Sequence, residues 1–479
     1  MRITSWGTRI RREFDALDTL YAGEETGSNW TTVVTGANGT KKSLLLRLLL
    51  EGTLKAKPWF RLGSNATIHP KVSGVPEIRS GSPIIAISGT PFDRFPRKTN
   101  YRNASRLNSY EGNPRYTYLG LKAANGTMGA AHSMRTIGYL MLDAIGKKEK
   151  SWRSARQVMD FLGLGYSVVV SLRLHTSLSR LDADTESHDE YEQLPGEPRE
   201  SEMQSYLRSV SSKALSSDSR DEVLHSLMGS DSALEQLIRR LHSFPLEVVL
   251  NFHDGAPSSM AHKGFTVSEL MTLVQLNVIV IAKLLVTKTD TGEEIAAEQD
   301  LSSGQWHIFF TMLGLALSLD HNSLVVVDEP ENSLHPEWQW RYIDLLERVM
   351  SGSTGCHVVI ATHSPLIASG VKEGAGNVVR LVPSVDGPIG IAVKQEELTF
   401  GWDAGDVYRK TFEMESTRAL SFVDTADRAL ALVRDGKDKS QEFRVIASEL
   451  ANTAQSLPEE DTMRSVINAI TKIAEGEKA

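Results

Sequence analysis

The sequence of 479 residues contains a single cysteine, Cys356, so no intramolecular disulfide can form. This cysteine lies just before the apolar run 357–361, which favours a small core residue over a nucleophile. A chain without disulfides fits a reducing compartment, and we expect a cytoplasmic location.

Long apolar runs and excess positive charge are also missing. No stretch reaches the ~18 apolar residues that would span a bilayer, and the first residues lack the apolar core of a signal peptide, so we expect no membrane partner. Lys and Arg number 52 against 60 Asp and Glu, a formal net charge of −8. This balance is unlike that of a strongly basic nucleic-acid binder, although it is compatible with a local basic patch.

A glycine-rich loop lies between an expected strand, 30–35, and an expected helix from about residue 42. It nearly follows the pattern G-x-x-x-x-G-K-[ST], in which backbone N–H groups surround phosphates, the Lys contacts the β- and γ-phosphates and the hydroxyl binds Mg²⁺. Lys41 replaces the second glycine and is expected to open the helix. A plain strand-turn-helix is the alternative. The predicted nucleotide-binding residues are Gly36, Ala37, Asn38, Gly39, Thr40, Lys41, Lys42 and Ser43, with Ser43 also a ligand of Mg²⁺.

Two adjacent carboxylates, Asp328 and Glu329, follow the apolar segment 324–327. At the end of a buried strand, Asp328 can hold the Mg²⁺ shell, and Glu329 can orient and deprotonate the attacking water. A solvated strand end would give the same pattern. The desolvation cost of two adjacent carboxylates, together with a phosphate loop upstream, favours the catalytic interpretation.

The segment 301–305 reads L-S-S-G-Q, about two dozen residues before Asp328 and just before an expected helix. It resembles the L-S-G-G-Q signature of ABC ATPases, with Ser303 in place of a glycine. In that family the signature contacts the γ-phosphate bound by the opposite subunit, which implies a head-to-tail dimer around ATP. The alternative is an ordinary serine N-cap. The resemblance assigns this role to Ser302, Ser303, Gly304 and Gln305.

A histidine, His363, follows the next expected strand, 357–361. In ABC ATPases a histidine at this place contacts the γ-phosphate and the catalytic water, although a single histidine at a strand end is more often structural. The segment 332–336 occupies the place of the D-loop, which crosses the dimer interface in the family. The glutamine that the family usually carries after the strand 83–88 is absent, and Ser88 or Asp93 is the candidate substitute.

Buried strands that alternate with helices predict an α/β fold with a mixed, mostly parallel sheet covered on both faces. With the motifs in this order, the chain resembles ABC/SMC-type ATPase heads over about residues 25–60 and 300–385, and the wording of 328–336 is similar to the RecF/OLD-related branch. We predict ATPase lobe I with the phosphate loop at 1–180, a linker and helical insertion at 181–245, lobe II at 246–395 and a helical C-terminal region at 396–479.

The segment 88–96 and the polar C-terminal helices are similar to those of the Septu anti-phage ATPases, which also occur with retrons. The resemblance implies ATP and Mg²⁺ as cofactors and a homodimer or higher oligomer. It also implies a separate HNH-type nuclease subunit, docked on the C-terminal region, and contact with a reverse transcriptase–nucleic acid complex or with DNA. Two alternatives stay open: a RecF-like DNA repair or DNA-binding ATPase, and a nucleotide-binding scaffold with little hydrolysis. An adjacent gene for a small HNH protein would favour the defence role.

Overall fold

The structure is a computed structural model. It describes residues 3–10, 13–17, 28–54, 61–62, 66–67, 69–74, 82–90, 93, 95, 115–121, 130–145, 150–175, 178, 200–215, 222–252, 264–383 and 391–476. The chain divides into two compact units, Met1–Trp402 and Asp403–Ala479. The predicted linker at 181–199 lies outside the described residues.

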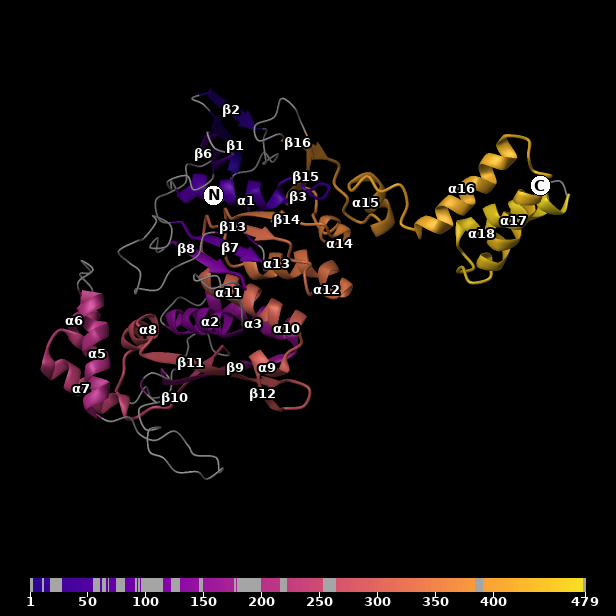
Figure 1. Ribbon diagram of the computed structural model, residues 1–479. Helices are drawn as coiled ribbons and strands as arrows, with labels where there is room; N and C mark the ends of the chain where they lie inside the picture. The colour runs from indigo at the N-terminus through magenta and orange to yellow at the C-terminus, as the bar shows by residue number, and fades with distance from the viewer. Residues whose placement is uncertain are drawn as a thin grey trace. The chain divides into compact units, whose positions relative to one another are not determined.

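The first unit is built on a sheet whose strands run in the order β16-β15-β3-β14-β13-β7-β8 (Figure 1). All neighbouring strands pair in parallel except β15 and β16, which are antiparallel. Every residue of the central strands β3, β13 and β14 is buried, and most are Val, Ile, Leu or Thr, as strands buried on both faces require. The bounds are β3 Trp30–Thr35, β7 Ile84–Ser88, β8 Tyr116–Leu119, β13 Leu324–Asp328, β14 His357–Ala361, β15 Gly376–Pro383 and β16 Ile391–Glu396.

Helix α1, Lys42–Leu54, covers one face of this sheet (Figure 1). Its leucines form a core with alternate strand residues such as Val34, Val326 and Val359. The intervening residues, among them Val325, are equally buried and face the helices of the opposite layer. These helices are α2 Ala130–Ala144, α3 Lys150–Leu162, α9 Ala297–Asp300, α10 Ser303–Ile308, the π-helix Phe309–Leu313, α11 Gly314–Ser318, α12 Pro336–Trp340, α13 Tyr342–Met350 and α14 Pro365–Ala368.

Smaller sheets flank the central one. An antiparallel sheet of order β2-β1-β6 pairs Ile3 with Gly74, far along the chain, and another has the order β10-β9-β11-β12. Their bounds, with those of the pair β4-β5, are β1 Ile3–Ile10, β2 Glu13–Leu17, β4 Arg61–Leu62, β5 Ala66–Thr67, β6 His69–Gly74, β9 Leu164–Leu174, β10 Leu246–Asn251, β11 Ile279–Lys288 and β12 Glu294–Ala296.

Two further groups of helices complete the described chain. One comprises α5 Glu200–Leu215, α6 Glu222–Met228, α7 Asp231–Leu241 and α8 Val267–Gln275. The second unit comprises α15 Ala404–Lys410, α16 Leu420–Arg434, α17 Gln441–Ala454 and α18 Thr462–Glu475. Its core is formed by Phe443, Ile446, Leu450 and Ile467 with small residues of α16. No described helix is both long and apolar enough to cross a bilayer.

The predicted fold class is confirmed: the sheet is mixed and mostly parallel, helices cover both faces, and the C-terminal region is helical. Three expected helices differ in detail. The helix at 304–317 contains a π-helical turn, the helix at 336–350 breaks at Arg341, and the expected helix at 431–457 is two helices joined by a turn at 435–440. The domain boundaries predicted from the sequence stay predictions.

Candidate nucleotide site

The glycine-rich loop leaves β3 and enters α1 through unusual backbone conformations. Gly36 has a φ of 145°, and a Cβ there would lie 2.8 Å from the carbonyl oxygen of Leu381, so a side chain does not fit. Lys41 has a φ of 65°, in the left-handed region, and the helix begins at Lys42. The expectation that Lys41 opens the helix is therefore wrong. Lys41 instead adopts the conformation that glycine adopts most easily, which costs a lysine ~1 kcal/mol or more.

The side chain of Lys42 folds back over this loop. Its Nζ donates to the carbonyl oxygen of Gly36 at 2.9 Å and contacts that of Ala37 at 3.4 Å. Burial lowers the pKa of Lys42 to about 8, while the charges of Glu329 and other nearby carboxylates oppose the shift. The ammonium group thus lies between the loop carbonyls and an acidic cluster, where it is available to an incoming anion.

Ser43 and Asp328 meet at the end of β13. Ser43 Oγ donates to Asp328 Oδ1 at 3.1 Å, and Asp328 is fully buried. Its other oxygen, Oδ2, has no hydrogen-bond partner in the described part of the chain. The pKa of Asp328 is raised to about 7, mainly by burial, with the charges of Glu329 and Asp93 adding to the shift and the Ser43 hydrogen bond opposing it. A buried carboxylate in this state needs a cation.

These two residues fit the Mg²⁺ that the family resemblance implies. A hydroxyl and a carboxylate oxygen are hard ligands, and Mg²⁺ is usually held by one or two protein groups together with phosphates and water. The orphaned Oδ2 of Asp328 supplies the position that such an ion would use. In agreement with this sparse ligand set, the described residues contain no group of three or more His, Cys, Asp or Glu that could hold a metal alone.

Glu329 is held at a sharp turn beyond the strand. Its φ is 48°, its N–H donates to the carbonyl oxygen of Ala361 at 2.9 Å, and Asn332 Nδ2 donates to its Oε2 at 3.0 Å. A Cβ on Gly89 would lie 2.1 Å from the Glu329 carbonyl oxygen, so the backbone at Gly89 must approach closely. The side chain of Glu329 is half-buried and keeps a second oxygen for another group.

His363 lies in the same cluster, as the sequence predicts. The pKa of this half-buried histidine is lowered by burial and by the charge of Lys42, while Glu329 opposes the shift. Glu331, which no sequence motif singles out, holds it: this side chain is half-buried, its Oε1 accepts from the His363 N–H at 2.6 Å, and its Oε2 accepts from Thr362 Oγ1 at 2.8 Å. The only sequence signal was the additional acid in Asp328-Glu329-Pro330-Glu331.

The signature residues do not join this cluster within one chain. Ser302 caps α10, and Ser302 and Gln305 bond reciprocally: the N–H of each donates to the other's side-chain oxygen, at 3.0 and 3.3 Å. Helices α10 and α1 lie on opposite sides of the sheet (Figure 1). Ser302 and Ser303 are exposed, whereas a Cβ on Gly304 would lie 2.8 Å from the Ser333 carbonyl oxygen.

The two candidates for the missing glutamine differ. Ser88 Oγ donates to the carbonyl oxygen of Thr90 at 2.9 Å, in a local turn. Asp93 is buried and accepts from Tyr118 Oη at 2.7 Å and from the Phe95 N–H at 3.0 Å. Because its charge acts on Asp328, Asp93 lies near the catalytic carboxylates. Residues 91, 92, 94 and 96 of this segment are outside the described part.

Comparisons with known proteins match parts of this chain. Residues 183–369 match the family described as "AAA domain, putative AbiEii toxin, Type IV TA system". That match contains the signature residues, Asp328, Glu329 and His363, and starts after the phosphate loop.

Two curated relatives match short stretches. Protein ea59 of Escherichia phage lambda is 30% identical over 120 residues, 25% of this chain and 22% of that protein. Septu protein PtuA of Bacillus thuringiensis is 26% identical over 115 residues, 22% of this chain and 26% of that protein. The chain thus spans about a quarter of the length of the curated relatives it matches.

Solved structures with similarity include the Smc head domain of Pyrococcus furiosus, determined with an extended coiled coil bound to the C-terminal domain of ScpA. It is 11% identical, covers 83% of this chain and 96% of that chain, and has a TM-score of 0.30. UvrA2 from Deinococcus radiodurans is 14% identical, covers 80% of this chain and 36% of that chain, and has a TM-score of 0.27. The family match and the similarity to PtuA confirm the resemblance to ATPases of the ABC/SMC type.

Proposed function

We propose that this chain binds ATP with Mg²⁺ and hydrolyses it to ADP and phosphate. The observation that carries the proposal is the convergence of Lys42, Asp328 and Glu329 with the switch histidine at the ends of neighbouring strands. Three motifs that are far apart in the sequence supply one cationic group, one candidate metal ligand, one candidate base and one imidazole.

Nucleotide binding follows from the loop geometry. The phosphates of ATP would replace the carbonyl oxygens of Gly36 and Ala37 as partners of the Lys42 ammonium, and would meet the N–H groups at the start of α1. Burial lowers the pKa of Lys42, and the binding of an anion would oppose this shift because it favours the protonated form. Lys42→Ala should therefore abolish nucleotide binding.

Hydrolysis needs a water that is oriented and deprotonated. Asn332 holds one oxygen of Glu329, which leaves the other to accept a proton from water, and Glu331 holds the backbone of His363 so that its imidazole faces the same space. Mg²⁺, bound by Ser43 and Asp328, would supply positive charge beside the phosphates. The residues of this chain thus position the water and exchange its proton.

The complete site would need two chains. Ser302 and Ser303 are exposed at the start of α10, which lies across the sheet from the loop of its own chain. A helix N-terminus with exposed serines suits a phosphate bound by another protomer. We therefore propose a head-to-tail homodimer, or a higher oligomer, that closes around ATP.

The cellular role that we propose is control of a partner nuclease in anti-phage defence. The similarity to PtuA over 115 residues supports this role, as does the family described as a putative toxin of a toxin–antitoxin system. An HNH-type nuclease subunit docked on the helical unit Asp403–Ala479 is the partner we propose, with a reverse transcriptase–nucleic acid complex as a further one. Co-purification from the native host with mass spectrometry of the bound chains tests the partners.

The decisive enzymatic test compares ATP turnover by the wild-type chain and by Glu329→Gln. We expect Mg²⁺-dependent phosphate release from the wild type, and ATP binding without release, in a trapped dimer, from the variant. Turnover that is equal in both and near background would contradict hydrolysis and leave a nucleotide-binding scaffold. Lys42→Ala serves as the control that loses binding as well.

A further inference from the structure

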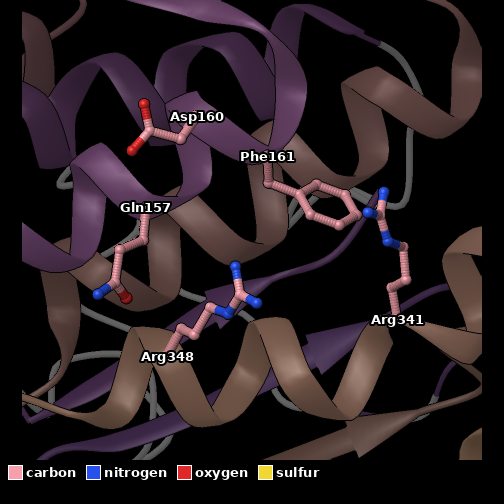
Figure 2. A pocket seen from close by; sticks show the side chains of 5 residues that line it. All are labelled: Gln157, Asp160, Phe161, Arg341 and Arg348. Atoms are coloured by element: carbon pink, nitrogen blue, oxygen red, sulfur yellow. The ribbon is translucent and has the colours of Figure 1, made fainter.

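A pocket of about 240 Å³ opens between helices α3 and α13, in the helix layer across the sheet from α1 (Figure 2). Its walls are fixed to each other, because Ser154 Oγ of α3 donates to the carbonyl oxygen of Val349 in α13 at 2.7 Å in a buried hydrogen bond. The lining side chains are Gln157, Asp160, Phe161, Arg341 and Arg348.

Two arginines give this pocket its charge. Arg341 and Arg348 are seven residues apart, at the start and in the last turn of α13, so they lie on the same face of the helix. The Arg348 side chain makes no hydrogen bond or ion pair with the described residues. The nearest carboxylate recorded for Arg341 is Glu337, at 3.6 Å and on an exposed side chain. Neither guanidinium is neutralised by a close bidentate partner, and both are accessible to an anion.

An unpartnered acceptor faces the same space. Gln157 Oε1 is buried and has no hydrogen-bond partner in the described part of the chain. A buried amide oxygen without a donor is costly, so a ligand that brings an N–H group is favoured here. Asp160, the acidic member of the lining, already accepts a 2.5 Å hydrogen bond from Tyr166 Oη. That bond directs part of its negative charge away from the arginines.

Aromatic rings complete the surface. The Phe161 ring lies under the Arg341 guanidinium, 5.6 Å from it, and meets the Trp338 ring edge-on at 5.5 Å. Phe161 therefore brings an aromatic ring to the pocket beside the two guanidinium groups.

We propose that this pocket binds a nucleotide unit of a single-stranded nucleic acid. The arginines pair with backbone phosphates, and an unpaired base lies against Phe161 and donates an N–H to Gln157 Oε1. The pocket takes a strand rather than a duplex because the base must be free of its own pairing to reach Gln157. It takes a strand rather than a free nucleotide because Arg341 and Arg348 lie about two helical turns apart, so each pairs with a different phosphate of a continuing backbone.

This site is separate from the ATP site, and its occupancy does not depend on hydrolysis. The test is fluorescence anisotropy of a labelled 20-nucleotide single-stranded DNA with the full-length chain. We expect the double variant Arg341→Ala/Arg348→Ala to bind about tenfold or more weakly. The salt dependence of log K should also become shallower by one to two, since two phosphate contacts are lost.

Arg208→Ala/Arg239→Ala is the matched control, because it removes the same two charges from exposed arginines of α5 and α7. It should leave the affinity and the salt slope unchanged. Retained ATP binding by the double variant would show that it is folded, and this readout separates failure of the strand site from failure of the proposed ATP site. Equal binding by the double variant and the wild type would overturn the proposal.

Two competitors distinguish the sources of the nucleotide. In a Lys42→Ala background, AMP should displace the labelled strand only at far higher concentration than an unlabelled strand of the same length. AMP that competes as well as the strand would reassign the pocket to a free nucleotide and contradict our proposal. A duplex of the same sequence that binds as tightly as the single strand would contradict it as well.

Discussion

Glu331 Oε1 accepts the main-chain N–H of His363 at 2.6 Å, so a side chain from the loop after β13 fixes the backbone of the loop after β14. The other oxygen of Glu331 accepts from Thr362 Oγ1 at 2.8 Å. Burial raises the pKa of Glu331, although these hydrogen bonds to its charged form oppose the shift. Thr362 and the switch histidine are therefore held by one half-buried carboxylate.

Glu331→Ala should reduce the kcat of ATP hydrolysis about tenfold or more and change KM little. The substitution leaves the His363 N–H and the Thr362 hydroxyl without their acceptor, which costs ~1–3 kcal/mol and frees the histidine to move. Steady-state ATPase kinetics measure the effect. Glu331→Gln is the matched control, since an amide oxygen still accepts from His363 and the Thr362 hydroxyl can rotate to accept from the amide. A Gln variant as impaired as the Ala variant would show that charge, and not position, is what Glu331 supplies.

Lys41→Gly should preserve ATP affinity and leave the unfolding temperature equal or slightly higher. Lys41 has a φ of 65°, so glycine removes ~1–2 kcal/mol of backbone strain and adds back ~0.5–1 kcal/mol of chain entropy. Lys41→Val, with a β-branched side chain that resists this conformation, should lower both the ATP affinity and the unfolding temperature. Isothermal titration with ATP and thermal unfolding of the two variants provide the comparison. If Lys41→Gly lost ATP as completely as Lys42→Ala does, the charge of Lys41 would be essential and our assignment of the phosphate lysine incomplete.

Ser302→Arg should leave ATP binding to the monomer intact and eliminate cooperative turnover. The substitution places a bulky cation on an exposed helix start that faces away from the loop of its own chain, so only a partner's phosphate site would be affected. Nucleotide titration, the dependence of ATPase rate on protein concentration and light scattering test this together. Unchanged cooperative turnover would refute the two-chain site.

Elements with strong local signals could be predicted from the sequence. The segments 30–35 and 357–361 have the bounds of β3 and β14, because unbroken β-branched and apolar runs leave few other structures. The motif residues Lys42, Asp328 and His363 could be singled out for a related reason. Each lies only a few residues from the end of an expected strand, so its place can be read from the adjacent sequence.

Features that depend on distant partners could not be predicted. The pairing of Ile3 with Gly74 joins segments that carry no mutual signal. The helix breaks at Arg341, where no proline or glycine in the sequence indicates a break. Glu331 looks like a surface acid until β14 brings Thr362 and His363 beside it, so its role appears only in the folded chain.

His307 provides a prediction about stability and pH. It is fully buried in α10, its Nε2 has no hydrogen-bond partner in the described part of the chain, and burial alone lowers its pKa to about 4. The unfolded chain takes up a proton near the ordinary pKa of 6.5 and the folded chain does not, so the stability conferred by the neutral form is complete above pH 6.5 and is lost as the pH falls toward 4.

His307→Leu should therefore flatten the pH dependence of the free energy of unfolding between pH 7 and pH 5. Each pKa unit corresponds to ~1.4 kcal/mol, so the wild type should lose ~2 kcal/mol more than the variant across this interval. Urea unfolding at pH 7 and pH 5 measures both slopes, and His225→Leu, at an exposed histidine of α6, is the control that should behave like the wild type. Leucine has no group that titrates. Equal losses of unfolding free energy by the wild type and His307→Leu would therefore mean that the folded chain protonates His307. Water would then reach the turn where α10 continues into the π-helix.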